Sequence, residues 1–443
     1  MKKTILLISA LLTILPVFAS DNEAKKEEAP VKQHLQNHFK FYGFIRNYFA
    51  FDTRESMSGT GNLFYYLPKD IKINDLGQDL NEQPSFRFLA LTSRAGVDVS
   101  GYHMDNVHFG AKIEADFYSG LSGSTGTATM RLRQAYLTIT WKDLEKSKIN
   151  TVGLKVGQAW HPMAADHPHV FSLEVGAPFG PFSRTPQVTM DASLGKNWIL
   201  TASALWQMQY TSMGPAGASA DYMKYGCTPE IYAGLTYKSD SFLMRAGADM
   251  LSIKPRNVGP APVMDDSYEV KVKDRITTVS AYAYAQYVHK LLSIKAKTTY
   301  GFAGEHMNLM SGYVRTDMDL SDGSYSYAPL HSSSSWLSLS YGKKWQGVLF
   351  LGYMKNLGLA QDAPNGPVSA SDIYFSKNGF SNLTQMYRIQ PELVYNIGKL
   401  NLGIEYQYTA VQYGKNFNAR ALVTDDLHWV ANHRIQMMVK YNF

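Results

Sequence analysis

Apolar and polar residues alternate along most of this chain with a period of two. Between residues 107 and 117 the odd positions are Val, Phe, Ala, Ile, Ala and Phe, whereas the even positions are His, Gly, Lys, Glu and Asp. Successive side chains of a β-strand point to opposite faces of a sheet, so the pattern predicts a strand with one apolar and one polar face. The alternation returns in residues 400–409 and 434–443.

About sixteen such segments follow one another from residue 39 onward, and the connections between them alternate between short and long. Tight turns at one end and long loops at the other are typical of an up-and-down barrel that spans a membrane. The approximate spans of the predicted strands are 39–54, 85–100, 106–118, 130–142, 150–160, 186–194, 198–210, 229–238, 242–254, 275–289, 292–304, 333–343, 347–357, 386–397, 400–413 and 431–443.

The N-terminal segment has a different character. Lys2 and Lys3 precede an apolar stretch over 5–18, and Ala19 ends a short cleavage-site pattern, so we interpret residues 1–19 as a secretory signal peptide. Residues 20–38 are rich in charge and predict either a mobile periplasmic leader or a short helical extension. The predicted barrel then occupies residues 39–443.

A soluble β-sandwich also shows alternating strands and is the alternative to a barrel in the outer membrane. The signal peptide, the persistence of the rhythm along the whole chain and the terminal aromatic Phe443 favour the membrane barrel. Such a barrel must close, because an open edge in lipid would leave backbone N–H and C=O groups unpaired. We therefore predict an all-β, antiparallel transmembrane barrel.

Composition narrows the function. Of the 443 residues, 45% are hydrophobic and 18% are charged, which excludes a disordered chain. One cysteine excludes a disulfide framework and a multi-cysteine zinc site. A net charge of +6 is too small for this length to indicate nucleic-acid binding. No apolar run after the signal peptide approaches the roughly 18–20 residues of a membrane-spanning helix.

Two local features bear on the orientation of side chains in the predicted strands: the parity of two arginines and the positions of the aromatic residues. Arg131 and Arg133 share parity with apolar residues of their segment, so we expect either a β-bulge there or a position above the membrane. Many Tyr and Trp residues fall near strand ends, where aromatic girdles meet the lipid–water boundary. The expected girdle residues are Trp141, Trp160, Trp198, Trp206, Trp345, Tyr42, Tyr210, Tyr237, Tyr287, Tyr341 and Tyr441.

Several short motifs resemble those of known proteins. They are Phe41-Tyr42-Gly43-Phe44-Ile45-Arg46, Asp52-Thr53-Arg54, Arg131-Leu132-Arg133-Gln134-Ala135-Tyr136, Gly157-Gln158-Ala159-Trp160 and Val439-Lys440-Tyr441-Asn442-Phe443. In order and spacing they resemble the trimeric outer-membrane porins of Gram-negative bacteria, most closely the DcaP-like and Bacteroidetes-type porins. This resemblance implies a sixteen-stranded barrel, a homotrimer, passive diffusion, and recognition of Phe443 by the barrel-assembly machinery.

A barrel of this size leaves a water-filled lumen, whose inward charges set selectivity. Parity along the strands predicts which charged residues point inward. These pore-lining candidates are Arg46, Arg94, Asp98, Lys112, Glu114, Asp116, Lys155, Arg245, Asp249, Lys295, Lys297, Arg388, Glu392, Glu405 and Arg434. For any one of them, a solvated side chain paired with a neighbour is the simpler interpretation.

Loop 161–185 is the candidate constriction. It follows the fifth predicted strand, and its compact, moderately apolar sequence suits a segment that lies against the barrel wall. In porins, the loop at this place folds into the lumen. Its charged residues are Asp166, Glu174 and Arg184, and the facing wall would supply Arg46, Arg94, Arg131 and Arg133. An external cap or a trimer contact is the alternative.

Other chemistry finds little support. A metal site in loop 161–185 would use His161, Asp166, His167 and His169, but their spacing matches no metal-binding signature. A few loop acids could bind Ca²⁺, but solvated charge is the simpler interpretation; they are Asp265, Asp266, Asp317, Asp319 and Asp322. No GxSxG, HExxH, Walker A or GxGxxG motif occurs. We therefore predict no enzyme, no metal and no cofactor.

The sequence thus predicts an outer-membrane porin that lets small hydrophilic solutes diffuse through its lumen. A channel selective for anions, dicarboxylates, phosphate or oligosaccharides is the first alternative. A non-conducting barrel that acts as an adhesin or receptor is the second.

Overall fold

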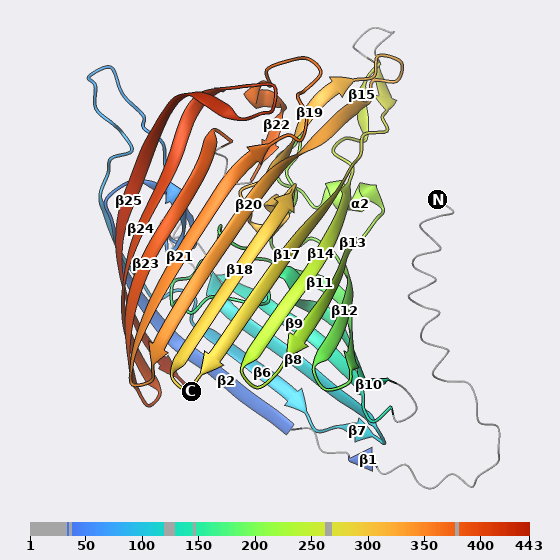
Figure 1. The fold of residues 1–443 in the computed structure, drawn as a ribbon, viewed down its shortest axis with the longest axis vertical. Helices are drawn as coiled ribbons and strands as arrows, with labels where there is room; N and C mark the ends of the chain where they lie inside the picture. The colour runs from blue at the N-terminus through green and yellow to red at the C-terminus, as the bar shows by residue number, and fades with distance from the viewer. Residues whose placement is uncertain (1–32, 35–37, 119–128, 145–147, 262–267, 377–380) are drawn as a thin grey trace, which may run out of the picture.

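The computed structural model describes residues 33–34, 38–118, 129–144, 148–261, 268–376 and 381–443 (Figure 1). The predicted signal peptide, most of the leader, and the acids Asp265 and Asp266 lie outside these residues. Within them, no helix is long and apolar enough to cross a membrane.

The fold is a closed antiparallel barrel of sixteen strands, as the alternation predicted. One wall strand is interrupted: β5 (Ser85–Leu89) and β6 (Arg94–Ser100) pair in succession with β2. The ring closes where β25 pairs with β2, from Asn442 opposite Phe44 to Arg434 opposite Asp52. The other wall strands are β2 (His38–Asp52), β8 (Val107–Tyr118), β9 (Thr129–Trp141), β10 (Ile149–Trp160), β11 (Arg184–Leu194), β12 (Trp198–Leu205), β13 (Glu230–Lys238), β14 (Phe242–Ile253), β17 (Ile276–His289), β18 (Leu292–Phe302), β20 (Tyr325–Gly342), β21 (Trp345–Gly358), β23 (Leu383–Ile397), β24 (Leu400–Phe417) and β25 (Val423–Asn442).

Alternation separates the two faces of the wall. Along β17 the side chains are alternately buried and exposed, with Tyr282 and Tyr284 turned inward. In β9 the register shifts: Glu114 pairs with Gln134, whereas the next residue, Ala115, pairs with Leu132. Arg133 is therefore the extra residue of a β-bulge. The bulge resolves the parity of this segment and turns Arg131 inward, where it binds Asp116.

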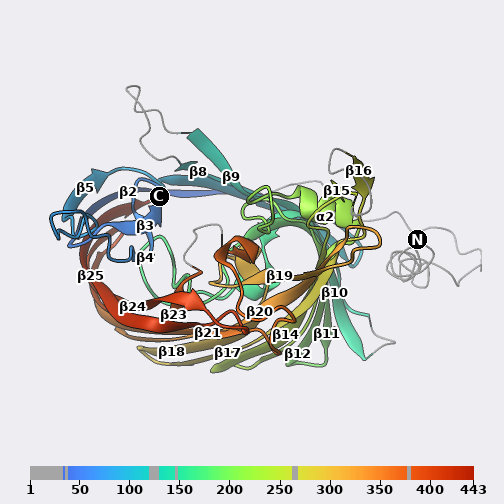
Figure 2. The same ribbon diagram turned by 90° about the horizontal axis from the view of Figure 1, so that it is seen from above.

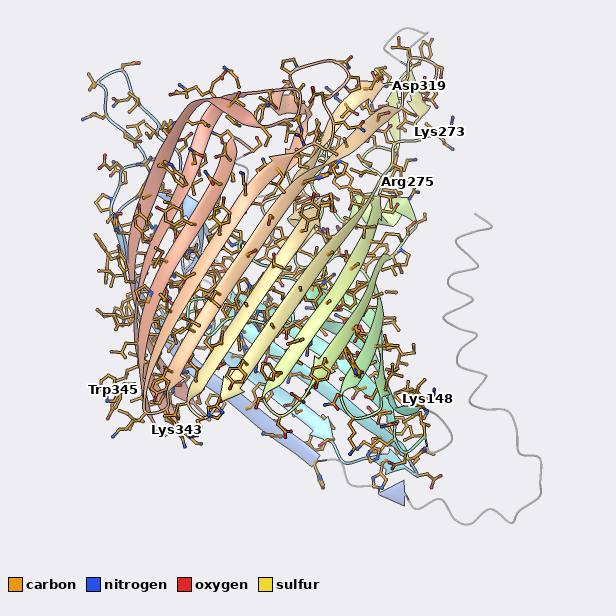
Figure 3. The ribbon with its side chains drawn as sticks, viewed as in Figure 1. Lys148, Lys273, Arg275, Asp319, Lys343 and Trp345 are labelled. Atoms are coloured by element: carbon orange, nitrogen blue, oxygen red, sulfur yellow. The ribbon has the colours of Figure 1, made fainter. Side chains whose placement is uncertain are left out.

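The two rims differ. Short turns join the strands at the end that carries Lys343 and Trp345, and the long loops gather at the end that carries Lys273 and Asp319 (Figure 3). The turn between β23 and β24 consists of only Gly398 and Lys399, and Gly398 has a φ of +57°, a conformation that glycine adopts without strain.

Three long connections fold into the barrel from the loop end (Figure 2). The first contains the hairpin of β3 (Ser56–Gly59) and β4 (Phe64–Pro68), and β4 contacts β24 and β25. The second is the segment 161–183 with the short helix η2 (Pro162–Ala164), and the third is 303–311 with η3 (Gly304–Met307). Their buried apolar side chains, including Phe64, Phe179 and Met307, form one core inside the ring. The sequence predicted an inward loop only at 161–185.

The remaining elements lie outside the wall strands. They are β1 (Gln33–His34), β7 (His103–Met104), α2 (Asp221–Gly226), β15 (Val258–Pro260), β16 (Glu269–Lys271), β19 (Gly312–Met318), η4 (Ala370–Asp372) and β22 (Ile373–Phe375). Because β1 pairs with β7 and β2 begins at His38, the end of the predicted leader 20–38 belongs to the folded part of the chain.

Some of the expected girdle residues lie on the outer face of the barrel, whereas others point inward. On the outer face, Trp198 packs on Tyr237 at the turn end, and Trp345 and Tyr441 are exposed there. Tyr42 points inward and donates a hydrogen bond to Glu114. Trp160 and Tyr210 also lie inside, in contact with Phe182. Parity within a strand, not nearness to its end, decides which aromatic residues face lipid.

Candidate functional site

Segment 161–183 crosses the lumen, and its backbone is fastened to the far wall and to β2. Lys297 donates from Nζ to the Met163 carbonyl at 2.6 Å, and the Phe171 N–H donates to Glu392 at 3.0 Å. Tyr48 donates its hydroxyl to the Phe171 carbonyl at 2.6 Å. These bonds hold the segment at three separate strands, so its position in the lumen is determined along its length.

The acids of the segment face the same wall. Asp166 forms an ion pair with Arg245 at 2.9 Å. Glu174 forms one with Arg388 at 3.3 Å, and both side chains of this pair are buried. Glu174 also accepts a bond from Gln407 at 2.9 Å. The two carboxylates are thus used to attach the segment.

Glycines in the wall make room for the aromatic rings of the segment. A Cβ at Gly352 would lie 2.5 Å from the Phe179 ring, and one at Gly403 would lie 2.6 Å from the Phe171 ring. Both rings therefore pack directly on the strand backbone, and a larger residue at either glycine would push the segment away from the wall.

A cavity of about 530 Å³ remains between residues 167–175 of the segment and the opposite wall. That wall is formed by β2, β6, β8 and β9, with contributions from β25. The lining runs from Thr60 and Tyr210 near the loop end to Asn396, Asn401 and Lys440 near the turn end, so it follows the barrel axis.

The wall of the cavity carries a cluster of cations with few acids. Arg133 bridges Glu114 and Asp116 at 2.8 Å each, and Arg131 pairs with Asp116 at 3.0 Å. These two arginines therefore neutralise the two acids. Arg94 lies 3.5 Å from the same Glu114 carboxylate, which is already shared.

Two further cations lack a carboxylate. Among the described residues, Arg46 bonds only to the Thr92 hydroxyl at 2.7 Å through its guanidinium, and neither Arg46 nor Lys440 forms an ion pair. The inward ring of Phe44 lies between these cations. The Arg46 guanidinium is 4.8 Å, that of Arg94 5.0 Å and the Lys440 ammonium 4.6 Å from its centroid. The cavity consequently carries net positive charge around Phe44.

The charged candidates from the sequence fall into distinct places. Arg46, Arg94, Arg131, Arg133, Glu114, Asp116 and Glu392 line the cavity. Arg184 is buried beside it, with its guanidinium 4.6 Å from the Trp160 ring. A second group attaches segment 161–183 to the wall: Asp166, Glu174, Arg245, Lys295, Lys297 and Arg388. Glu405 is buried against Gln390, and Lys112 pairs with Asp98.

In the positively charged part of the cavity, sequence reasoning missed Lys440 and Phe44. The parity of the last strand places Lys440 with Arg434 on the polar face, so the signal for Lys440 was present. Nothing in the sequence pointed to Phe44, because an apolar residue among the inward polar positions has no charge or polar group that would single it out. The loop histidines were singled out only for a metal.

Those histidines do not meet. The His167 ring contacts the Trp160 ring edge to face, with centroids 4.4 Å apart, and His169 bonds to Ser293 at 3.0 Å. Burial and the nearby Lys297 lower the pKa of His167 to about 3, so its imidazole is neutral. Burial and Lys295 lower the pKa of His169 to about 4. Neither ring adds charge to the cavity near neutral pH.

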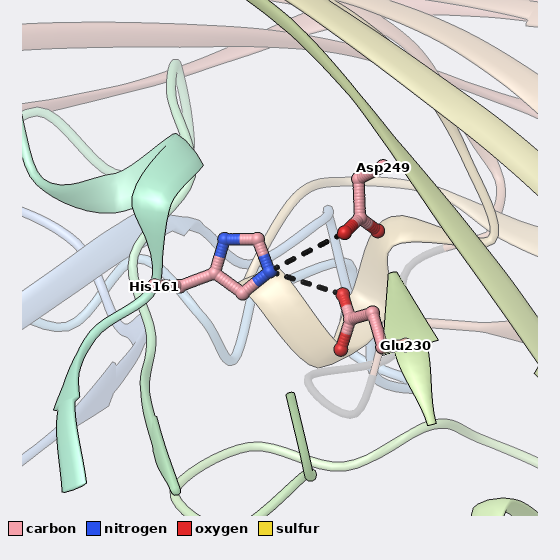
Figure 4. A group of neighbouring side chains, drawn as sticks. All are labelled: His161, Glu230 and Asp249. Atoms are coloured by element: carbon pink, nitrogen blue, oxygen red, sulfur yellow. Dashed lines mark hydrogen bonds and ion pairs between the residues drawn. The ribbon is translucent and has the colours of Figure 1, made fainter. Parts of the chain in front are cut away.

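His161 belongs to another cluster, with Glu230 and Asp249, whose residue types and proximity suit a metal (Figure 4). His161 Nε2 lies 3.1 Å from Glu230 and 3.7 Å from Asp249. However, the Met163 N–H donates to Nδ1 of the same ring at 3.1 Å. That bond leaves the ring proton on Nε2, which then donates to Glu230 and has no lone pair for a metal.

Glu230 accepts from a second histidine as well. His306, on the inward segment 303–311, lies 2.7 Å from the same oxygen. Although burial alone would lower it, Glu230 raises the pKa of His306 above its ordinary value, which favours the imidazolium. A single wall carboxylate therefore fastens two inward segments.

The comparison with solved structures supports the fold. No protein-family model matches the chain, and no curated protein matches it. Among solved structures, the outer membrane channel DcaP of Acinetobacter baumannii superposes with a TM-score of 0.61 at 17% identity, over 92% of this chain and 97% of that one. An anion-selective porin from Comamonas acidovorans gives 0.50 at 9% identity, over 92% and 100%. OmpF of Salmonella typhi, in complex with daunomycin, gives 0.50 at 12% identity, over 92% and 98%. This chain therefore has the sixteen-stranded barrel fold of the outer-membrane porins.

Proposed function

We propose that this protein is a porin of the Gram-negative outer membrane, through which small hydrophilic solutes diffuse passively. The observation that carries the proposal is the cavity of about 530 Å³ that follows the barrel axis beside segment 161–183 and is lined by charged side chains. In this proposal the segment is the constriction. The function requires no catalytic step, metal or cofactor.

A preference for anions is the second candidate. It is supported by Arg46 and Lys440, which have no carboxylate partner among the described residues, and by the neutralisation of Glu114 and Asp116 by neighbouring arginines. Fixed charge at a narrow part of a pore attracts ions of the opposite sign and repels the others. One of the solved structures with this fold is an anion-selective porin.

We further propose a homotrimer in the membrane and delivery by the barrel-assembly machinery. The terminal residue supports the second idea, because Phe443 bonds by its backbone to Gly43 in both directions, at 3.0 and 3.3 Å. The end of the chain thus lies at the seam where β25 meets β2, the last pairing that closes the ring.

Planar-bilayer recording of the purified protein tests the proposal. We expect conductance steps in groups of three and a reversal potential, under a KCl gradient, that indicates chloride preference. Steps without ion preference would support the general porin and refute the anion-selective one. Silence from protein whose β-structure is verified by circular dichroism would refute the porin and favour an adhesin or receptor.

A further inference from the structure

The three segments that fold into the barrel meet at the last of them, 303–311. Its Met307 carbonyl accepts a hydrogen bond from the Phe182 N–H of the constriction segment at 2.8 Å. Its Asn308 side chain donates to the Tyr66 hydroxyl of the β3–β4 hairpin at 2.6 Å. Phe182 also lines the cavity, so the position of segment 303–311 affects the lining of the passage.

One wall carboxylate fixes two of these segments. Glu230, the first residue of β13, lies 2.7 Å from Nε2 of His306 and 3.1 Å from Nε2 of His161 (Figure 4 shows the second contact). The other ring nitrogen of His306, Nδ1, lies 3.3 Å from the Ala303 carbonyl. Both nitrogens of His306 therefore face oxygen atoms, and only the imidazolium can donate to both of them. The pair of Glu230 and His306 is at most 2% exposed, so water does not replace a lost bond.

The residue before His306 is a second buried acid. Glu305 is fully buried, and one of its oxygens accepts from the Met213 N–H at 3.2 Å. Its other oxygen has no hydrogen-bond partner among the described residues. A buried carboxyl group that is only partly hydrogen-bonded is stable when neutral and costly when ionised. The other titratable groups of the cluster are Glu230, Asp249 on β14, His161 and Tyr313 on β19.

Both residues of segment 303–311 lose their favoured state as the pH rises. Burial raises the pKa of Glu305 to about 7, although the neighbouring His306 lowers it. Burial opposes the charge of His306, but Glu230 raises the pKa of that imidazole above its ordinary value. A group whose pKa is raised in the folded state stabilises that state at low pH, and this contribution is lost as the pH rises through the raised value. The two contributions therefore change in the same direction.

We infer that Glu305 and His306 form a pH-dependent latch, which holds segment 303–311 in the lumen in mildly acidic medium and releases it at alkaline pH. Ionisation of Glu305 adds a negative charge to the cluster, and loss of the His306 proton removes the positive charge that offsets Glu230. Release would take away the partner of the Phe182 N–H and loosen the cavity lining. The latch is a property of the fold, and only its effect on ion current rests on the proposed porin function.

The size of the effect follows from Glu305 alone. Its pKa is about 7 with the segment attached and has the ordinary value of 4.5 once the carboxyl group reaches water. Between about pH 6 and about pH 8.5, these two values reduce the ratio of attached to released segment about ten-fold. Deprotonation of His306 adds to this reduction.

Hydrogen exchange of the full-length protein in mild detergent measures this ratio. The readout is the protection of peptides that cover 303–311, corrected for the intrinsic pH dependence of amide exchange. In the wild type we expect protection to fall at least about ten-fold between about pH 6 and about pH 8.5. Glu305→Gln keeps an acceptor for the Met213 N–H and should remove that ten-fold change. Glu82→Gln is the matched control, because Glu82 is exposed on the first long loop and should behave as the wild type.

A second variant keeps the test decisive if Glu305→Gln does not form the barrel. His306→Gln has no positive charge at any pH, so its segment 303–311 should be less protected than that of the wild type already at about pH 6. Protection equal to the wild type in this variant would overturn the inference. Constant protection of the wild type across the pH range, or a pH dependence that survives in Glu305→Gln, would also overturn it.

Bilayer recording separates the latch from the porin. The wild type should show more open-channel noise at about pH 8.5 than at about pH 6, and Glu305→Gln should show a smaller increase. If the exchange depends on pH as expected but the protein carries no current, the latch is supported and the porin is refuted. If the current is equally quiet at both pH values and protection is constant, the latch is refuted and the porin stands.

Discussion

Arg46→Gln is the substitution that most directly tests the electrostatics of the cavity. Arg46 itself lines the cavity, beside the ring of Phe44, so an ion that passes its guanidinium comes within about 5 Å of the charge. Glutamine removes that charge and keeps a group that can bond to Thr92. No carboxylate loses a partner, since Arg46 has no ion pair among the described residues.

The magnitude follows from Coulomb's law. At about 5 Å in water the interaction with a monovalent ion is about 0.8 kcal/mol, and screening in 0.1 M salt reduces it to about 0.5 kcal/mol. Chloride loses this attraction while potassium loses an equal repulsion, so the difference is about 1 kcal/mol. That corresponds to a roughly five-fold fall in the chloride-to-potassium permeability ratio. In 1 M salt the fall should be less than about two-fold.

The assay is the reversal potential of single channels under a KCl gradient, repeated at low and high salt. Lys343→Gln is the matched control, because it removes one positive charge from an exposed turn outside the cavity lining (Figure 3). An unchanged permeability ratio for Arg46→Gln at low salt, or an equal fall for Lys343→Gln, would refute the placement of the selectivity at this cavity.

Three further predictions concern the inward segment. Glu174→Gln leaves the buried guanidinium of Arg388 without its carboxylate, which weakens the attachment of the segment by about 3–5 kcal/mol. We therefore expect more open-channel noise, and a current trace as quiet as that of the wild type would contradict this. Gly403→Val should push the Phe171 ring towards the cavity and lower single-channel conductance, whereas Gly347→Val, where an added Cβ meets nothing within 4 Å, should not; equal conductances would count against the packing. Because burial lowers the pKa of His167 from 6.5 to about 3, the imidazole stays neutral from pH 8 to 5, so His167 should add no rise in chloride preference over that range; a rise centred near 6.5 that His167→Gln abolishes would show a solvated ring instead.

The wall of the barrel could be predicted from local pattern alone. In each strand the alternation of apolar and polar residues shows which side chains face the lumen and which face outward. The expected segments correspond to the wall strands in number and order. The β9 segment needed its neighbour, since the bulge at Arg133 is visible only when the register with β8 is known. The inward orientation of Tyr42 and Trp160 was missed because nearness to a strand end was weighed above parity.

The site depended on contacts between residues far apart in the chain. Asp166 and Glu174 were expected to face the wall arginines, but the structure gives them to Arg245 and Arg388, strands away. The arginine that pairs with each carboxylate depends on how the loop crosses the lumen. The alternation along the strands carries no information about the path of the loop. The inward hairpin β3–β4 and segment 303–311 were missed for the same reason.

The sequence by itself determined that this chain is a closed barrel with a polar interior, because a strand with two unlike faces must place each face in its own medium, and an edge in lipid cannot stay unpaired. Only the tertiary structure decided where the interior is filled and where it stays open. Ring closure brings Arg46 on β2 beside Lys440 on β25, at opposite ends of the chain, and puts segment 161–183 across from them. The net charge along the passage comes from residues that are far apart in the sequence. These residues lie side by side only after the ring has closed.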